Sequence, residues 1–188
     1  MPGNPDQVYQ PEADTYLLLE ASRAEVQPGD RVLEIGTGSG TIAAALMHTC
    51  DIVATDLNPH AVFCARTQGV DVVHGDLMSG IRGAFDLVIF NPPYLPTQPE
   101  ERLDDWLEYA LDGGPTGRLV IERFARDVRR VLAPGGRILL LVSSLTGLAE
   151  VRELFARYGL EMTIAAQQKV EDEELYVLRF ISSGGQRP

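Results

Sequence analysis

Strand-like and helix-like patterns of apolar residues alternate along this chain after residue 30. Short apolar runs predict strands, and the stretches between several of them are typical of helices packed on a sheet. The predicted strands cover residues 31–35, 51–55, 70–74, 85–90, 137–143, 160–168 and 174–181, and the predicted helices cover 40–49, 59–68, 117–132 and 147–158. This alternation indicates an α/β fold in which helices sandwich one sheet.

The C-terminal part of the chain departs from this alternation. Only the acidic segment Glu171 to Glu174 joins the last two predicted strands, which predicts an antiparallel hairpin at the sheet edge. Pro134-Gly135-Gly136 is expected to be a turn that delivers Arg137 into the fifth strand. A length of 188 residues with 45% hydrophobic content is typical of one core, so residues 1–188 are predicted to form a single domain.

The charge balance is acidic, with 27 Asp and Glu against 16 Lys and Arg and a formal net charge of −11. Such a surface repels a phosphate backbone, so direct nucleic-acid binding is not favoured, although a local basic groove stays open. The most closely clustered bases fall on one predicted helix and are interpreted as its solvated face: Arg118, Arg123, Arg126, Arg129 and Arg130.

The sequence predicts neither a membrane span nor a metal site. The longest uninterrupted aliphatic run, Ile138 to Val142, is too short for a bilayer, and the N-terminus has no basic segment followed by an apolar one. A soluble cytoplasmic protein is therefore expected. Cys50 and Cys64 lack C-x-x-C spacing and are expected to be buried free thiols. The histidines are scattered and receive no metal or general-base role: His48, His60 and His74.

A glycine-rich turn, Glu34-Ile35-Gly36-Thr37-Gly38-Ser39-Gly40, lies between the first predicted strand and an apolar helix. Strand, glycines and helix in this order are typical of a nucleotide site. Glycines here allow a tight turn, close approach of the backbone to a ligand, and close packing of the helix on the strand. The spacing is G-x-G-x-G instead of the dinucleotide G-x-G-x-x-G, which favours an adenosyl ligand without a pyrophosphate.

Acidic residues follow the next two predicted strands. Asp56 stands twenty residues beyond Gly36, where a carboxylate can accept both ribose hydroxyls. Asp76 follows the third strand and could accept a hydrogen bond from the adenine amino group. Each acid alone is more typical of a loop or a helix cap. Because the acids follow successive strands, the ligand interpretation is favoured, and the neighbouring Leu57 and Leu77 are counted with them.

The tetrapeptide Asn91-Pro92-Pro93-Tyr94 follows the fourth predicted strand. An amide or exocyclic amine nitrogen attacks a methyl donor poorly because its lone pair is delocalised, so it has to be held and polarised. The side-chain carbonyl of Asn91 and the backbone carbonyl of Pro92 can accept its two N–H hydrogens, and Tyr94 could lie flat against the target. A proline-rich turn that merely closes the strand is the alternative. Beside the glycine turn, methylation of a planar nitrogen is favoured.

These motifs, in this order, resemble those of class I S-adenosylmethionine-dependent methyltransferases. That class has a Rossmann-like sheet of seven strands in the order 3-2-1-4-5-7-6 with helices on both faces. Residues 8–19 resemble the Y-x-P-x-x-D-T opening of the archaeal and eukaryotic HemK-like methyltransferases, and residues 110–118 resemble their G-G-x-x-G-R element. The resemblance covers nearly the whole chain, from about Val8 to Phe180.

Members of this family methylate the side-chain amide of glutamine in the Gly-Gly-Gln motif of class I translation release factors. The resemblance therefore implies S-adenosylmethionine as cofactor, residues 1–30 as a segment that closes over it, and residues 182–188 as a flexible tail. It implies catalytic roles for Asn91, Pro92 and Tyr94. The residues it implies for cofactor binding are Tyr9, Asp14, Thr15, Glu34, Gly36, Gly38, Gly40, Asp56, Leu57, Asp76, Leu77 and Asn91.

The chain departs from this family pattern at one position. Ala13 stands where the family openings usually carry glutamate, and Glu12 lies one position earlier. Bacterial HemK enzymes carry a helical substrate-binding domain ahead of the fold, and only about thirty residues precede the first strand here, so substrate recognition is expected from loops or a partner. Short family members resemble subunits that pair with a small zinc-binding activator by adding a strand across the sheet. A heterodimer is therefore expected.

Other interpretations stay open at this point. The tetrapeptide also serves adenine-N6 methyltransferases of nucleic acids, some relatives modify lysine in proteins, and a non-catalytic cofactor-binding subunit is a third alternative. The tail carries Gly184-Gly185-Gln186, a copy of the Gly-Gly-Gln motif. Chance is the simpler explanation of that copy, and automethylation or self-occlusion of the site is the alternative.

Overall fold

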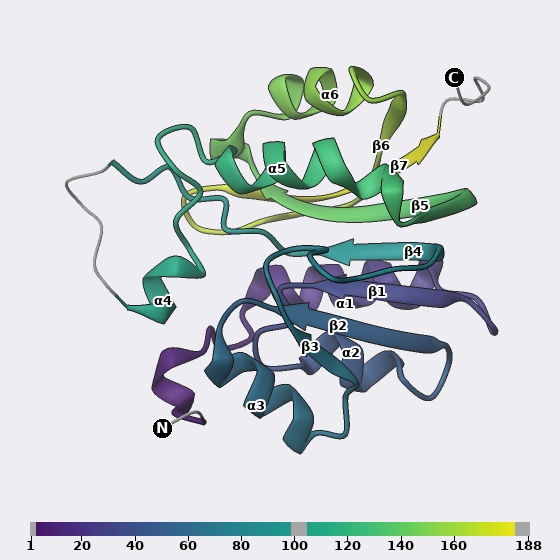
Figure 1. Cartoon of the computed structure of the whole chain (residues 1–188). Helices are drawn as coiled ribbons and strands as arrows, with labels where there is room; N and C mark the ends of the chain where they lie inside the picture. Colours follow the sequence, from purple (N-terminus) through teal and green to yellow (C-terminus); the bar gives the residue numbers. More distant parts are fainter. Residues whose placement is uncertain (1–2, 99–104, 183–188) are drawn as a thin grey trace.

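The computed structural model describes residues 3–98 and 105–182 and contains one mixed sheet (Figure 1). The strand order is β3-β2-β1-β4-β5-β7-β6, which confirms the predicted seven-stranded order. The strands are β1 Arg31–Ile35, β2 Asp51–Asp56, β3 Val72–His74, β4 Phe85–Phe90, β5 Leu132–Ser143, β6 Leu160–Lys169 and β7 Glu174–Ser182. The helices are α1 Ala13–Glu25, α2 Thr41–Leu46, α3 Pro59–Thr67, α4 Trp106–Tyr109, α5 Leu119–Asp127 and α6 Leu148–Ala156, with 3-10 turns at Pro5–Gln7, Val128–Arg130 and Ser144–Thr146.

Strands β1 to β5 run in parallel, and β7 runs antiparallel to both β5 and β6. The predicted C-terminal hairpin is therefore confirmed. Because the five parallel strands end at the same edge of the sheet, four segments meet there: the glycine turn after β1, Asp56 at the end of β2, Asp76 after β3 and the tetrapeptide after β4.

Helices cover both faces of the sheet, as predicted. Helices α5 and α6 pack on one face, where an aromatic series runs through the core: Phe90, Phe124, Phe155 and Phe180. Helices α1, α2 and α3 pack on the other face against the opposite side of the central strands (Figure 1). The central strands are thus buried on both sides, and for this reason they form continuous apolar runs in the sequence.

Helix α1 has no counterpart among the predicted elements. The sequence analysis predicts only a segment that closes over the cofactor, yet Leu18 and Leu19 of this helix are buried in the core. The buried side of α1 also carries Asp14, Thr15 and Ser22. Three polar residues on the buried side interrupt the apolar stripe from which a helix would be predicted.

The boundaries around the fifth strand also differ from the prediction. The helix predicted over 117–132 ends at Asp127 and is followed by a 3-10 turn, and β5 begins at Leu132. The predicted turn at Pro134–Gly136 lies inside β5, where the pairing with β4 shifts register. Helix α4 was not predicted either, because four residues are too few to show a helical period.

An ion-pair network fixes the C-terminal end of α1 to the sheet. The side chain of Arg137 is 9% exposed and pairs with Glu25 at 2.8 Å and with Asp30 at 2.6 Å. Its guanidinium also donates to the carbonyl oxygens of Glu25 and Asp86. Arg179 pairs with the same Glu25 carboxylate at 3.0 Å. Helix α1 is therefore tied at Glu25 to β5 and β7.

Four of the five clustered arginines are exposed, as the predicted solvated face requires, and Arg118 is partly buried. Only Arg123 and Arg126 lie on α5 itself. Four of the five also contact neighbouring segments, which the sequence did not predict. Arg130 donates to the carbonyl oxygens of Ile81 and Met78 at 2.8 and 2.9 Å. The other three contacts are Arg118 to the Thr146 carbonyl, Arg123 to the Asp76 carboxylate and Arg129 to the Tyr158 carbonyl. Among the residues that the structure describes, Arg126 forms an ion pair with its neighbour Asp127, and its side chain is exposed.

Within residues 3–98 and 105–182, no helix is long and apolar enough to cross a bilayer, and no group of acids, cysteines and histidines is placed to hold a metal. Cys50 and Cys64 are free, but both are half-buried, where the sequence predicts burial. His60 accepts the backbone N–H groups of Gly3 and Asn4. Residue 182 ends β7, and the rest of the predicted tail, including Gly184-Gly185-Gln186, lies outside the described residues.

Candidate active site

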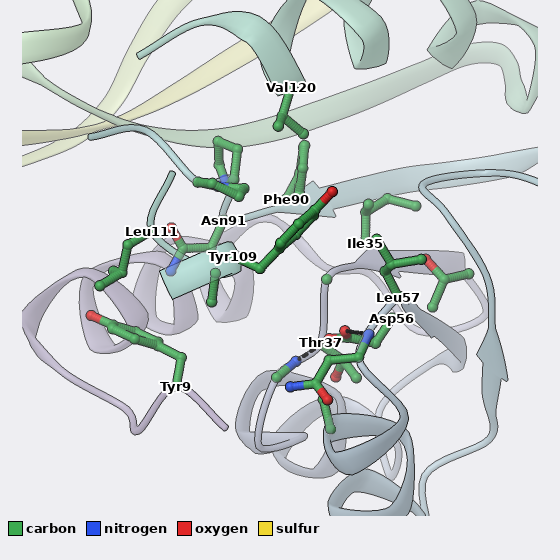
Figure 2. Close-up of a pocket in the computed structure, with 18 of the residues that line it drawn as sticks. Tyr9, Ile35, Thr37, Asp56, Leu57, Phe90, Asn91, Tyr109, Leu111 and Val120 are labelled. Carbon is green, nitrogen blue, oxygen red and sulfur yellow. Dashed lines mark hydrogen bonds between the residues drawn. The ribbon is translucent and has the colours of Figure 1, made fainter. Parts of the chain in front are cut away.

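A cavity of about 330 Å³ opens at the carboxyl ends of β1, β2 and β4, at the point where the strand order reverses (Figure 2). This is the usual ligand position in open α/β sheets. With the exception of Gly40, every residue predicted for the site lines this cavity: Tyr9, Asp14, Thr15, Glu34, Gly36, Gly38, Asp56, Leu57, Asp76, Leu77, Asn91, Pro92 and Tyr94. Segments that lie far apart in the sequence are therefore brought together as predicted.

The glycine turn depends on backbone conformations that only glycine adopts readily. Gly36, Gly38 and Gly40 have φ values of 63°, 55° and 87°. Gly36 and Gly38 bring the backbone to the cavity surface. Gly40 has a different role, because a β-carbon there would lie 2.9 Å from the Cα of Ala65 in α3. The close packing predicted at Gly40 is therefore between α2 and α3, and not between a helix and a strand.

The buried side chain of Glu34 stabilises the glycine turn through two hydrogen bonds. Its carboxylate accepts hydrogen bonds from the Thr37 hydroxyl at 2.7 Å and from the Ala43 N–H at 3.1 Å. Burial raises the pKa of Glu34 to about 8, and the nearby Asp56 carboxylate acts in the same direction, while the two hydrogen bonds act in the opposite direction. Glu34 thus lines the cavity and also fixes the backbone after β1, which lines the cavity as well.

Asp56 connects the glycine turn to the loop after β2. Its two carboxylate oxygens accept the N–H groups of Gly38 and Asn58, each at 2.8 Å, and burial raises its pKa. Each carboxylate oxygen has a second lone pair, so Asp56 can still accept two hydroxyl groups from a ligand in the cavity. The exposed side chain of Leu57 lies beside it and supplies an apolar wall.

The loop after β3 contributes Asp76 and Leu77 to the other side of the cavity. Asp76 pairs with Arg123 of α5 at 2.5 Å, and both residues line the cavity. Leu77 has φ of 50°, which is unusual for a residue with a branched side chain, and its carbonyl accepts the Thr55 hydroxyl at 2.9 Å. The arginine partner of Asp76 was not foreseen, and the adenine contact of Asp76 stays a prediction.

The amide of Asn91 has one end paired and one end unpaired. Asn91 Nδ2 donates to Asp14 Oδ2 at 2.9 Å, and Tyr9 donates from its hydroxyl to Asp14 Oδ1 at 3.1 Å. Asn91 Oδ1 is buried and has no hydrogen-bond partner within the described residues. A buried carbonyl oxygen without a partner is costly, and it is explained most simply by a donor that arrives with a ligand.

Tyr94 lies on a loop that is fixed by the glycine-rich segment before α5. Leu95 exchanges backbone hydrogen bonds with Leu111 and Gly113, at 3.2 and 2.9 Å. Gly117 lies so close to the Tyr94 carbonyl that a β-carbon would overlap it. Burial raises the pKa of the Tyr94 hydroxyl, with further contributions from nearby carboxylates, so Tyr94 is expected to act as a neutral side chain.

The sequence analysis missed an apolar and aromatic part of the site. These lining residues come from the end of β4, from α4 with its following turn, and from α5: Phe90, Trp106, Tyr109, Leu111 and Val120. Figure 2 shows Tyr109 projecting from α4 across the cavity. A local signal for α4 does exist, because the Asp105 side chain caps the N–H of Glu108. Aromatic residues that line the cavity suit a flat ligand or peptide group.

Comparison with known proteins then identifies the family. Residues 10–104 match the methyltransferase small domain. One relative, from Methanocaldococcus jannaschii, is named as a protein N5-glutamine methyltransferase. It is 39% identical over 180 residues, which cover 92% of this chain and 90% of that protein. Methyltransferase HEMK2 of Mus musculus is 37% identical over 194 residues, covering 94% and 90%.

The chain belongs to the HemK2-type glutamine methyltransferases. The structure of Mtq2 from the E. cuniculi Mtq2–Trm112 complex superposes with a TM-score of 0.80 at 31% identity, covering 94% of this chain and 99% of that one. The class I methyltransferase fold expected from the sequence is thereby confirmed. Membership of a methyltransferase family implies the use of S-adenosylmethionine.

Proposed function

We propose that this glutamine methyltransferase transfers a methyl group from S-adenosylmethionine to the glutamine side-chain amide of the Gly-Gly-Gln motif in a class I translation release factor. The observation that carries the proposal is the buried, unpaired Oδ1 of Asn91 at the cavity. An amide nitrogen has two N–H hydrogens, and one of them satisfies this oxygen. The carbonyl of Pro92, which follows directly, is proposed to accept the other.

The relatives support this choice of substrate. The E. cuniculi Mtq2–Trm112 complex is responsible for the methylation of the eRF1 translation termination factor, and Mtq2 is matched over 94% of this chain. A release factor glutamine methyltransferase of Deinococcus radiodurans is 39% identical over 140 residues, although the chain spans only 49% of that protein. A release factor also implies the cytoplasm as the location of the reaction.

The residues of the cavity suit S-adenosylmethionine. Gly36 and Gly38 allow the backbone to approach an adenosyl ligand, Asp56 is proposed to accept the ribose hydroxyls, and Asp76 is proposed to accept the adenine amino group. When bound, the cofactor supplies an electrophilic methyl group on a sulfonium. The proposed roles of Tyr9 and Thr15, close to Asp14, are to close the cavity on the same side as Asn91.

The proposed mechanism depends on orientation and hydrogen bonding. Asn91 and Pro92 hold the amide nitrogen so that its lone pair faces the methyl group, and Tyr94 packs against the amide plane. No strong base is required, because the nitrogen becomes acidic once it is methylated and can lose its proton to water. The raised pKa of Tyr94 is consistent with a packing role for this side chain.

We further propose that a small zinc-binding activator forms a heterodimer with this chain by adding a strand to the sheet. Strand β3 is a sheet edge, and two apolar side chains, Val73 in β3 and Phe63 in the contacting helix α3, are 40% and 48% exposed. An edge strand presents unpaired backbone groups to a partner strand, and exposed apolar side chains add contact area. These features support the β3 edge as the docking position.

The experiment compares the chain alone with the chain plus a candidate activator, each incubated with labelled S-adenosylmethionine and the cognate release factor. Peptide mass spectrometry then locates the label. Methyl on the Gly-Gly-Gln glutamine supports the proposal, and a release factor with that glutamine replaced by alanine should stay unlabelled. Methyl on another residue would overturn the proposed substrate. If mixing produces neither a complex nor higher activity, the activator proposal fails.

Two alternative substrates make different predictions. An adenine-N6 methyltransferase would bind DNA or RNA with a strong salt dependence, and a protein lysine methyltransferase would label lysine in the same peptide maps. The net charge of −11 and the engagement of Arg118, Arg123, Arg129 and Arg130 in contacts within the chain disfavour the nucleic-acid alternative.

A further inference from the structure

Asp14 shares its carboxylate among donors from several segments. The residue lies in the first turn of α1 and is 4% exposed. Its Oδ1 accepts the Tyr9 hydroxyl and both the N–H and the hydroxyl of Thr15, and its Oδ2 accepts Asn91 Nδ2. No ion pair to Asp14 occurs in the part of the chain that the structure describes, and its partners there are these hydrogen-bond donors.

The contact with Asp14 fixes which end of the Asn91 amide faces the cavity. An asparagine amide has a donor end and an acceptor end of nearly equal size, and a half-turn exchanges them. A carboxylate only accepts, so it holds the NH₂ group and turns Oδ1 away. The result is the unpaired acceptor at Asn91 Oδ1. With the amide reversed, Asn91 would present N–H to the N–H of the substrate.

We infer that Asp14 is a positioning residue that sets the polarity of Asn91, and that it does not serve the cofactor as the sequence resemblance implies. The inference rests on the proposed function, because it assumes that the target is a donor of N–H. Asp14 does not touch the target in this arrangement. It acts through its hydrogen bond to Asn91, a residue 77 positions later in the sequence.

Helix α1 is built to hold Asp14 in place. The helix runs from Ala13 to Glu25, and at its far end Glu25 is paired with the side chains of Arg137 and Arg179. Near its start, Tyr9 and Thr15 restrain the carboxylate through Oδ1, the oxygen that Asn91 does not contact. A functional side chain is positioned best by a rigid element whose own contacts are fixed. Both ends of α1 meet that condition.

The charge of Asp14 also strengthens the acceptor. A hydrogen bond from Nδ2 to a carboxylate polarises the amide and increases the negative charge on Oδ1. During transfer the target nitrogen gains a bond to the methyl carbon while the carbon–sulfur bond breaks, so positive charge develops on the nitrogen and its N–H becomes a stronger donor. The bond to Asn91 Oδ1 therefore tightens in the transition state, and the nitrogen then releases one proton to water.

The first test is Asp14→Asn, which keeps the shape and removes the charge. The introduced amide can donate to Asn91 Oδ1, which would exchange the positions of the oxygen and the NH₂ group of Asn91. We therefore expect kcat to fall by about 100-fold, while the affinity for the cofactor changes by less than about threefold. Glu20→Gln, the same chemical change at an exposed position on the same helix, is the matched control and should leave kcat unchanged. A kcat within about threefold of wild type for Asp14→Asn, or a loss of cofactor affinity with kcat intact, would overturn the inference.

The second test exchanges the two side chains in Asp14→Asn/Asn91→Asp. In the exchanged pair, the amide introduced at position 14 donates to the carboxylate introduced at position 91. The second oxygen of that carboxylate then serves as the acceptor at the cavity. We expect kcat at least about tenfold above that of Asp14→Asn alone, because polarity is restored. A folded exchanged pair without this gain would overturn the inference. If Asp14→Asn alone fails to fold, the exchanged pair is compared with Asn91→Asp alone, in which two carboxylates face each other without a donor, and the same gain is expected.

A spectroscopic test does not depend on the substrate. The side-chain NH₂ signals of Asn91 should shift strongly in Asp14→Asn and not in Glu20→Gln, and unchanged signals would count against the contact. Failure of this inference is distinguishable from failure of the proposed function. If wild type labels the Gly-Gly-Gln glutamine and Asp14→Asn does so equally fast, only the role of Asp14 is wrong; if wild type never labels that glutamine, the substrate is wrong.

Discussion

Gly117 packs directly against the carbonyl oxygen of Tyr94, closer than a residue with a β-carbon could approach. The contact places the glycine-rich segment before α5 behind the loop that carries Tyr94. Gly113 is similarly close to Gly117, with 2.7 Å from a β-carbon at Gly113 to the Gly117 Cα. The G-G-x-x-G-R element of the sequence thus supports the loop that carries Tyr94.

Gly117→Ala is therefore expected to displace Tyr94 and to lower kcat by about tenfold to 100-fold, with cofactor affinity nearly unchanged. Steady-state kinetics and calorimetry measure the two quantities. Gly135→Ala is the matched control, because Gly135 also has a positive φ, 77°, but no atom lies within 4 Å of its β-carbon position. It should cost about 1–2 kcal/mol of stability and leave kcat unchanged. Equal kinetic effects of the two variants would contradict the supporting role.

Asp56→Ala is expected to weaken cofactor binding. The substitution removes the proposed acceptor of the ribose hydroxyls and also frees the N–H of Gly38 in the glycine turn. The dissociation constant for S-adenosylmethionine should rise at least about tenfold by calorimetry, while turnover at saturating cofactor falls much less. Asp51→Ala, at the exposed start of the same strand, should leave binding unchanged. An unchanged dissociation constant for S-adenosylmethionine in Asp56→Ala would show that Asp56 does not bind the cofactor.

Arg137→Ala is expected to be strongly destabilising. It leaves the carboxylates of Glu25 and Asp30 poorly exposed and without their main partner, which costs about 3–5 kcal/mol for a buried pair. Urea unfolding measures the change. Arg23→Ala breaks an exposed pair with Glu20 on the same helix and should cost about 1 kcal/mol or less. Similar losses in both variants would show that the network around Arg137 does not anchor α1.

The pH dependence of stability is expected to include a contribution from Glu34. Burial raises its pKa from 4.5 to about 8, so between those values the folded protein keeps a proton that the unfolded chain has lost. The free energy of unfolding therefore falls as pH rises through this window, and the contribution is fully present only below about pH 4.5. Glu34→Gln does not titrate and should flatten this slope in urea unfolding between about pH 5 and 8. Parallel slopes would contradict the raised pKa.

The sheet could be predicted from the sequence because strands buried on both faces form apolar runs. The glycine turn and the order of the motifs could be predicted because each motif follows one of these runs directly. Helix α1 escaped prediction because Asp14, Thr15 and Ser22 occupy its buried side. Two of these polar residues, Asp14 and Thr15, line the cavity. The interruption in the apolar pattern therefore coincides with residues at the candidate site.

The partners of the predicted residues could not be read from the sequence. Asp76 was predicted as a cofactor ligand without Arg123, which lies 47 positions away, and Asp14 was predicted as a cofactor residue without Asn91. Local patterns do not encode such contacts, because they depend on how distant strands end at the same edge of the sheet. The contacts that the clustered arginines make with neighbouring segments could not be predicted for the same reason.

The central claim is that the unpaired oxygen of Asn91 holds the target amide. The single-turnover methylation rate of Asn91→Ala at saturating cofactor tests it most directly, with cofactor affinity measured on the same sample. The rate on the Gly-Gly-Gln glutamine should fall by at least about 100-fold while the affinity for S-adenosylmethionine stays within about threefold of wild type. A preserved rate, with or without weaker cofactor binding, would contradict the claim.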